Sequence, residues 1–301
     1  MSSCVINNRI LCSSVTQGLK TYNKRVIVSG KVVEYYSYES DVICDKKPSR
    51  NVGLHEVTEE EKAQNRKKSA QRARVTVRRL VNSNMDLTKF VTLTFKECVT
   101  DLTQANKVFN LFIKRLKRVL KKPLKYLVVP EFQDKNGRGA VHYHMISNLD
   151  YIPNEKLRNI WGQGFVKINR IDNVDNVGAY VTKYMSKDNV DERLSGRKCY
   201  FCSRNLDKPV VFKQLETVEN VMQDVVSDEK NIKRIRSFDF FSEHLGNVAY
   251  SQIILKTLIN IEKHKKRLSF WYKVKKGLQR VGELPFIIPR KYTQLSFGGA
   301  L

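Results

Sequence analysis

The chain has 301 residues, enough to bury a substantial hydrophobic core in one domain with appendages or in two domains. Its 55 lysines and arginines outnumber 30 acidic residues, so the net charge is +25, which favours nucleic acid or an anionic membrane as the partner. No apolar run approaches the ~20 residues needed to span a bilayer, and the N-terminus lacks a signal-peptide pattern. We therefore expect a cytoplasmic protein that binds nucleic acid rather than a membrane.

Residues 1–80 are predicted to form a basic N-terminal extension. Residues 26–28 and 31–36 favour two strands joined by a tight turn. Thr58 is suited to cap a helix that continues to about residue 80, because three glutamates follow it where the helix macrodipole stabilises negative charge. Seven basic residues between positions 66 and 79 make this helix cationic, which indicates either contact with DNA phosphates or a solvated face.

Residues 81–215 carry the pattern from which the fold class is predicted. Turn-forming residues at 134–139 indicate a hairpin between the strands on either side. The order of elements predicts an α+β fold, in which helices pack on an antiparallel sheet. The expected strands lie at 90–95, 124–132, 139–146, 165–171, 198–203 and 209–212, and the expected helices at 103–122, 153–161 and from 172 or 173 to about 187.

Residues 216–301 are predicted to be a C-terminal extension of uncertain role. Apolar residues between 253 and 261 favour a helix. Residues 263–280 then carry eight lysines or arginines around three successive aromatic residues, 270–272. This composition suits either single-stranded nucleic acid, where rings stack on bases, or a peripheral helix with its lysine stems laid along apolar surface.

The strand expected at 139–146 contains two histidines that could bind one metal ion. Strand side chains alternate, so His142 and His144 share a face. The hairpin places Glu131 and Gln133, which also share a face, on the neighbouring strand. Two imidazoles and one carboxylate leave positions for phosphate oxygens, a set that suits Mn²⁺ or Mg²⁺. Glu131 is the preferred third ligand because of its charge, with Gln133 as the alternative; a structural pair of surface histidines is the other interpretation.

Residues 180–187 contain two consecutive Tyr-x-x-Lys units. Tyr180 and Tyr184 are four positions apart and Lys187 follows three later, so a continuous helix would place all three on one face. Two phenols and an ammonium on one stripe could face a metal-bound phosphate. Ordinary amphipathic packing of the rings is the alternative.

The order of these motifs resembles that of HUH endonucleases, and more specifically of rolling-circle replication initiators (Rep proteins) of bacterial plasmids and single-stranded DNA phages. The resemblance covers about residues 65–215 and implies a five-stranded antiparallel sheet with flanking helices, here with a basic N-terminal helix and a C-terminal extension added. The paired tyrosines resemble the phage type. The motifs are the strand at 90–95, then His142-Tyr143-His144, then Tyr180-x-x-Lys183-Tyr184-x-x-Lys187.

The resemblance implies a function and a role for each matching residue. His142 and His144 match the metal-binding pair, Tyr180 and Tyr184 the nucleophiles, and Lys183 and Lys187 the lysines beside them. The expected enzyme uses Mn²⁺ or Mg²⁺ to nick single-stranded origin DNA, forms a 5′-phosphotyrosine, leaves a 3′-OH primer and later rejoins the strands.

Partners and rival functions follow from the same interpretation. The chain lacks a G-x-x-x-x-G-K-[ST] phosphate loop, so we expect it to depend on a host helicase and DNA polymerase in the bacterial cytoplasm. A transposase or conjugative relaxase is an alternative within the nuclease class. A non-catalytic module that binds single-stranded nucleic acid through an RNA-recognition-like fold is the alternative from another class, indicated by residues 162–168.

Overall fold

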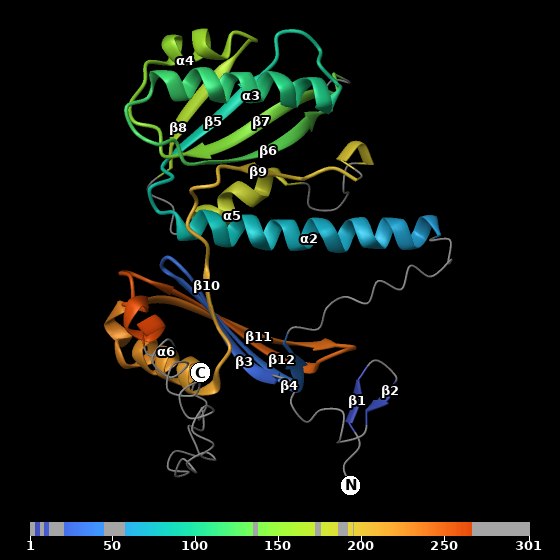
Figure 1. The fold of residues 1–301 in the computed structure, drawn as a ribbon, viewed down its shortest axis with the longest axis vertical. Coiled ribbons are helices and arrows are strands. Elements are labelled where there is room, and N and C mark those ends of the chain that lie inside the picture. Colours follow the sequence, from blue (N-terminus) through green and yellow to red (C-terminus); the bar gives the residue numbers. More distant parts are fainter. Residues whose placement is uncertain are drawn as a thin grey trace, which may run out of the picture. The chain divides into compact units, whose positions relative to one another are not determined.

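The computed structural model describes residues 21–44, 58–134, 138–171, 176–185, 192–194 and 196–266, together with the backbone of two short paired strands, β1 (Cys4–Ile6) and β2 (Arg9–Leu11). The side chains of Tyr184 and Glu192 are outside this description. The chain divides into two compact units, Met1–Leu258 and Ile259–Leu301, and the first contains two five-stranded sheets (Figure 1). No helix in the described ranges is both long and apolar enough to cross a bilayer.

One sheet carries both histidines, and we call it the histidine sheet. Every neighbouring pair of its strands is antiparallel, which confirms the predicted five-stranded antiparallel sheet. Its strands, in spatial order, are β8 (Val166–Arg170), β5 (Lys89–Thr94), β7 (Ala140–Ser147), β6 (Tyr126–Gln133) and β9 (Phe201–Cys202).

Helices cover both faces of the histidine sheet (Figure 1). On one face lie α3 (Leu102–Val119) and α4 (Asn154–Trp161), with Phe112 and Trp161 fully buried against Tyr143 and its neighbours. Helix α3 begins where Asp101 accepts backbone hydrogen bonds, and it ends at Val119, earlier than the predicted residue 122. On the other face Phe90 and Ile146 pack with residues of α2 (Glu59–Ser83) and α5 (Val177–Val181).

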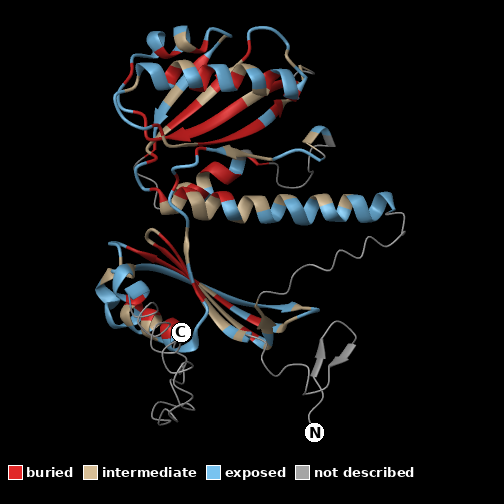
Figure 2. Cartoon of the chain, in the orientation of Figure 1, coloured by how far each residue is buried: buried red, intermediate tan, exposed pale blue. Residues whose placement is uncertain are grey.

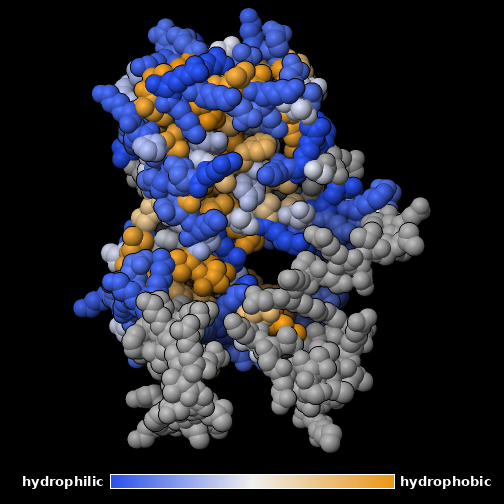
Figure 3. Space-filling view, in the orientation of Figure 1, coloured by the Kyte–Doolittle hydropathy of each residue, from blue (hydrophilic) through white to orange (hydrophobic). Residues whose placement is uncertain are grey.

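Helix α2 confirms the predicted cationic helix and its start. The Thr58 hydroxyl accepts a hydrogen bond from the amide of Glu61, and the Glu61 carboxylate accepts one from the amide of Thr58, which completes a capping box. Only Val77 and Val81, near its C-terminal end, are buried. The N-terminal half is exposed and hydrophilic (Figures 2 and 3).

The second sheet combines strands from both ends of the chain, and we call it the aromatic sheet because tyrosine and phenylalanine rings line one of its faces. The strand order is β10 (Val210–Phe212), β3 (Thr21–Ser29), β4 (Val32–Ile43), β12 (Gly246–Leu255) and β11 (Ile232–Ser242). The predicted hairpin of residues 26–36 is confirmed as β3 and β4, and β4 pairs with β12. Helix α6 (Leu215–Ser227) buries three valines, Val218, Val221 and Val225.

This sheet corrects one expectation and extends another. The helix predicted from the apolar residues at 253–261 is wrong, because residues 253–255 end strand β12. Ile253, Ile254 and Leu255 are all buried, so both faces of the strand are covered there, and the resulting apolar run lacks the alternation that identifies a strand. The divisions at residues 80 and 215 stay predictions, but the pairing of β4 with β12 shows that segments from the two extensions fold together. The aromatic cluster at 270–272 lies outside the described residues.

Candidate active site

The two histidines lie on the same face of β7, as predicted. His142 pairs across the sheet with Thr94 of β5 and Glu131 of β6. His144 pairs with Thr92 and Val129 on the same two strands. Tyr143 between them is fully buried on the opposite face, where its hydroxyl donates to Asn106 Oδ1 at 2.7 Å. The alternation of the strand therefore separates the structural ring from the two imidazoles.

The Glu131 carboxylate contacts His144 directly. Glu131 Oε2 lies 2.6 Å from His144 Nε2, and Thr92 Oγ1 lies 3.3 Å from Nδ1 of the same ring. The imidazole is buried while the carboxylate is partly open to solvent. The predicted third ligand thus meets one of the two histidines and fixes its orientation.

One ring nitrogen of His142 is buried without a hydrogen-bond partner among the described residues. This atom is Nε2, and the same holds for Oε1 of Gln133. Burial lowers the pKa of His142, and His144 and Arg138 lower it further against the opposing charge of Glu131. A neutral imidazole with an unpaired nitrogen is the form that binds a metal ion.

The donor atoms on this face fit a divalent cation in chemical type. Two imidazoles, the Glu131 carboxylate and the Gln133 amide oxygen come from adjacent strands. Among the residues that the structure describes, however, no three histidine, cysteine, aspartate or glutamate side chains converge into a metal cage. The carboxylate that would complete the set lies against His144.

Tyr180 lies on the same side of the sheet as the histidines. Its ring meets Phe90 edge-on, with centroids 5.5 Å apart, and Phe90 stacks on His144 at 5.8 Å with an angle of 17° between the rings. The ammonium of Lys183 is 5.6 Å from the centre of the Tyr180 ring. The structure therefore brings together four of the predicted site residues, namely Tyr180, Lys183, His144 and Glu131.

The helix that carries Tyr180 is shorter than predicted. It was expected from residue 172 or 173 to about 187, but α5 covers only Val177–Val181 and a 3-10 turn, η2 (Thr182–Tyr184), follows. Asn176 caps the start by accepting from the amide of Ala179, and the Thr182 hydroxyl donates to the Ala179 carbonyl at the other end. The predicted limits of this helix are therefore wrong, and residues 180–184 do not lie on one continuous α-helix. Lys187 and the side chain of Tyr184 lie outside the described residues.

A close contact between α5 and α2 positions Tyr180. The amide of Gly178 donates to Asn82 Oδ1 at 2.9 Å, and Asn82 Nδ2 donates to Asn176 Oδ1 at 3.0 Å. A Cβ added at Gly178 would lie 2.8 Å from the Cα of Arg78, closer than carbon atoms pack. Glycine is therefore required where the two helices cross. These residues were not predicted from the sequence, in which the only local signal is the small pair Gly178-Ala179 before the tyrosine.

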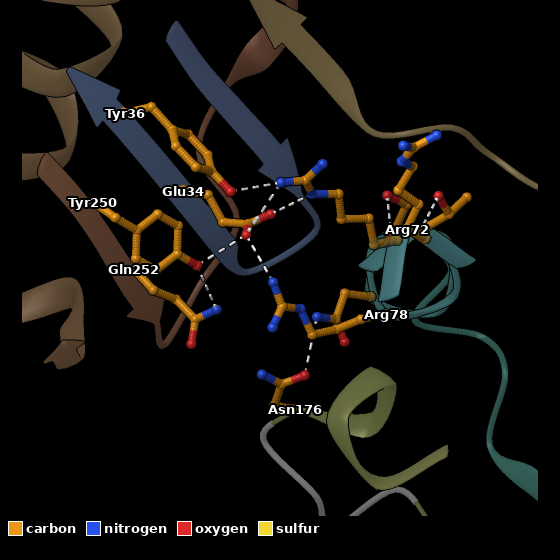
Figure 4. A network of polar contacts seen from close by, with 11 residues as sticks. Glu34, Tyr36, Arg72, Arg78, Asn176, Tyr250 and Gln252 are labelled. Atoms are coloured by element: carbon orange, nitrogen blue, oxygen red, sulfur yellow. Dashed lines mark hydrogen bonds and ion pairs between the residues drawn. The ribbon is translucent and has the colours of Figure 1, made fainter. Parts of the chain in front are cut away.

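A buried carboxylate holds α2 to the aromatic sheet. Glu34 of β4, whose side chain is 1% exposed, accepts hydrogen bonds from Arg78 Nη2 at 2.9 Å and Arg79 Nε at 2.6 Å. The hydroxyl of Tyr250 donates to it at 2.9 Å (Figure 4). Burial alone would raise the pKa of Glu34, but the hydrogen bond and charge of Arg79, with the charge of Arg78, outweigh it and leave the pKa below its ordinary value.

Contacts thus run from Glu34 through α2 to the tyrosine helix. Arg78 and Asn82 lie one turn apart on α2. Arg78 binds Glu34 (Figure 4), and Asn82 binds α5. Glu34 was not among the predicted site residues, and its signal in the sequence is a single acid among the apolar and aromatic residues 32–36.

Comparison with known proteins places one segment of the chain in context. Residues 88–189 match a family model of replication-associated proteins, the ORF2 family. The match begins at β5 and covers the histidine strand, Glu131 and both Tyr-x-x-Lys units, in agreement with the resemblance to replication initiators. No curated protein and no solved structure matches the chain.

Proposed function

We propose that this chain, which carries the replication-associated match at residues 88–189, initiates replication by nicking single-stranded origin DNA through tyrosine attack and later rejoining the strands. One observation carries the proposal: Phe90 contacts both Tyr180 and His144. Phe90 therefore links the Tyr180 ring to His144, which contacts Glu131, and all four residues lie within the matched segment.

His142, His144 and Glu131, with Gln133 as the alternative to Glu131, would hold the divalent cation, Mn²⁺ or Mg²⁺. The buried, unpaired nitrogen of His142 and the unpaired amide oxygen of Gln133 support this assignment. When bound, the cation would supply positive charge to the non-bridging oxygens of the scissile phosphate.

The tyrosine performs the covalent step. A phenol ordinarily titrates near pH 10, so attack at neutral pH needs a nearby cation or base, and the Lys183 ammonium beside the Tyr180 ring supplies positive charge. The phenol gives up its proton and its oxygen forms a bond to phosphorus, while the bond between phosphorus and the 3′-oxygen breaks. The leaving 3′-oxygen takes up a proton, so the proton count is unchanged. The products are a 5′-phosphotyrosine and a 3′-OH primer. Tyr184, with Lys187, would serve as the second nucleophile that allows closure.

The test is covalent capture of labelled DNA. Full-length protein is incubated with Mn²⁺ and 3′-labelled single-stranded oligonucleotides that tile the DNA around the coding region, because the adduct retains the 3′ fragment. We expect a labelled adduct on a denaturing gel, and its loss in the double variant Tyr180→Phe with Tyr184→Phe. Tyr151→Phe, at a highly exposed site on the same domain, is the matched control and should form the adduct normally. An adduct that persists in the double variant would refute the proposal.

The RNA-recognition-like alternative receives no support from the histidine sheet. Such domains stack bases on aromatic rings of their central strands. Here the inner strands are β5, β7 and β6. Their aromatic residues Phe90, Tyr143 and Phe132 are buried, and Tyr126 is partly buried against the core. Phe165, in the segment that suggested this alternative, is exposed but precedes the edge strand β8.

Initiation by a nicking enzyme also implies partners. With the strand cut, a helicase must open the duplex and a polymerase must extend the 3′-OH, so we propose that the host supplies both.

A further inference from the structure

Aromatic rings form a continuous track across one face of the aromatic sheet, outside the segment that matches the replication family. Strand register places Phe238 and Phe240 of β11 beside Tyr250 and Val248 of β12. Tyr250 in turn pairs with Tyr36 of β4. Successive ring centroids are separated by 6.2 Å (Phe240–Phe238), 4.9 Å (Phe238–Tyr250), 4.9 Å (Tyr250–Tyr36), 6.0 Å (Tyr36–Tyr38) and 6.1 Å (Tyr38–Tyr22).

The end of this track on β11 is open to solvent. Phe238 is 56% exposed and Phe240 is 43% exposed, although large rings on a sheet face are normally covered. Helix α6 packs on the opposite face, where Lys24 forms an ion pair with Glu219 at 3.6 Å. On the ring-bearing face α2 meets the sheet on β4, at Glu34 and Tyr36. The two phenylalanines lie on the edge strand β11, two strands away.

Positive charge accompanies the rings. Arg234 and Arg236 precede the phenylalanines at alternate positions of β11, so all four side chains share one face, and both arginines are exposed. The guanidinium of Arg25 lies 4.2 Å from the centre of the Tyr36 ring, and its Nε makes no hydrogen bond within the described residues. The acid on this face, Glu34, is neutralised by Arg78 and Arg79.

We propose that this face binds single-stranded DNA, with bases stacked on Phe238 and Phe240 and phosphates held by Arg234 and Arg236. Exposed rings next to cations suit unpaired bases, whose π-faces are free. They do not suit a duplex, whose bases are already stacked on one another. The identity of the ligand as DNA rests on the proposed function. The surface itself is separate from the nicking site and would guide the strand to or from it.

Binding of a non-cleavable probe tests the stacking. Fluorescence anisotropy of the full chain with fluorescein-labelled oligo-dT of about 30 nucleotides, longer than the ~4–16 nucleotides of a single binding fold, is measured without divalent metal. The double variant Phe238→Ala with Phe240→Ala should raise Kd by about tenfold or more, equivalent to about 1.4 kcal/mol. Phe241→Ala is the matched control, because Phe241 is 72% exposed on the same strand but lies on the opposite face of the sheet. This substitution should change Kd by less than about twofold.

Salt dependence tests the phosphate contacts. Arg234→Gln with Arg236→Gln should reduce the slope of log Kd against log salt concentration by about 1.4, which is two contacts at ~0.7 each for single strands. Arg234→Lys with Arg236→Lys keeps the charge and should keep the slope.

Three results would overturn the proposal. The first is unchanged oligo-dT affinity in the phenylalanine double variant, and the second is an equal loss for a duplex of the same length. The third is a lower molecular mass of the phenylalanine double variant than of the wild type, measured by light scattering, with unchanged oligo-dT binding. That result would identify the face as a self-association surface. If any of these results is found while the wild-type protein forms the covalent adduct, the binding surface is rejected and the nicking function is kept. If the wild-type protein forms no adduct but the phenylalanine double variant still binds oligo-dT more weakly, the nicking function is rejected and the binding surface is kept.

Discussion

Replacing Gly178 with alanine tests whether the contact between α5 and α2 sets the position of Tyr180. By intrinsic helix propensity alone, alanine in a helix is more favourable than glycine by about 1 kcal/mol. The contact predicts the opposite sign, because the added Cβ would lie 2.8 Å from the Cα of Arg78 and 2.9 Å from its carbonyl carbon.

The size of the effect follows from that overlap. Carbon atoms pack at about 3.5–4.0 Å, so α5 must move away from α2 by roughly 1 Å. Overpacking of this kind costs about 1–3 kcal/mol of unfolding free energy. A displacement of about 1 Å at a reacting group can lower a rate by about 100-fold, so we expect adduct formation to fall by about that factor.

Two measurements are needed, with one matched control. Urea unfolding reports the free energy of unfolding, and the initial rate of adduct formation with Mn²⁺ reports the position of the phenol. Ala179→Ser, at the exposed neighbouring position, should leave both unchanged. An adduct rate for G178A within about twofold of wild type would refute the positioning argument, and a gain in stability would show that the helices do not meet as closely as the contact implies.

Two further predictions concern Glu34 and the histidines. Glu34→Gln leaves Arg78 and Arg79 facing a neutral amide and should reduce the free energy of unfolding at pH 7 by about 3 kcal/mol, whereas Glu219→Gln, in an exposed ion pair with Lys24, should change it by less than about 1 kcal/mol. The pKa of Glu34 is lowered on folding, so its stabilisation is present above the ordinary carboxyl pKa of 4.5 and is lost as the pH falls through the lower pKa of the folded state. The difference in free energy of unfolding between wild type and E34Q, measured in urea, should therefore shrink in acid. A difference that does not depend on pH would contradict this. His142→Ala with His144→Ala should abolish adduct formation, as EDTA should for the wild type, while oligo-dT affinity falls by less than about tenfold. Equal loss of cleavage and binding would identify the histidines as structural.

Local rules predicted the elements whose stability is local. Thr58 and the three glutamates after it identified the start of α2, and the alternation in β7 correctly separated His142 and His144 from Tyr143. The hairpin register then brought Glu131 beside His142. In each case the signal and the contact lie on the same element or on two elements joined by a short turn.

The failures came where distant segments decide local structure. At the end of strand β12, Ile253, Ile254 and Leu255 are all buried, and the last two line a cavity together with Val81 of α2. Burial on both faces erases the alternation of a strand. Asn176, which caps the start of α5, also accepts a hydrogen bond from Asn82, far away in the sequence. Sequence periodicity contains no information about such partners, so both the false helix at 253–261 and the overlong tyrosine helix follow from the same cause.

The family match and the structural site therefore do not have the same limits. Residues 88–189 contain the histidines and Tyr180, but Val77 and Val81 of α2, outside this segment, pack in the same cluster as Phe90 and Tyr180. The tyrosine helix is held by Asn82, and α2 is held in turn by Glu34, both outside the matched segment. The chemistry assigned to the matched segment thus depends on a helix and a sheet built from the N- and C-terminal parts of the chain. Under the proposed function, a sheet that holds α2 and also presents exposed rings and arginines would couple the path of a single strand to the tyrosine that cuts it.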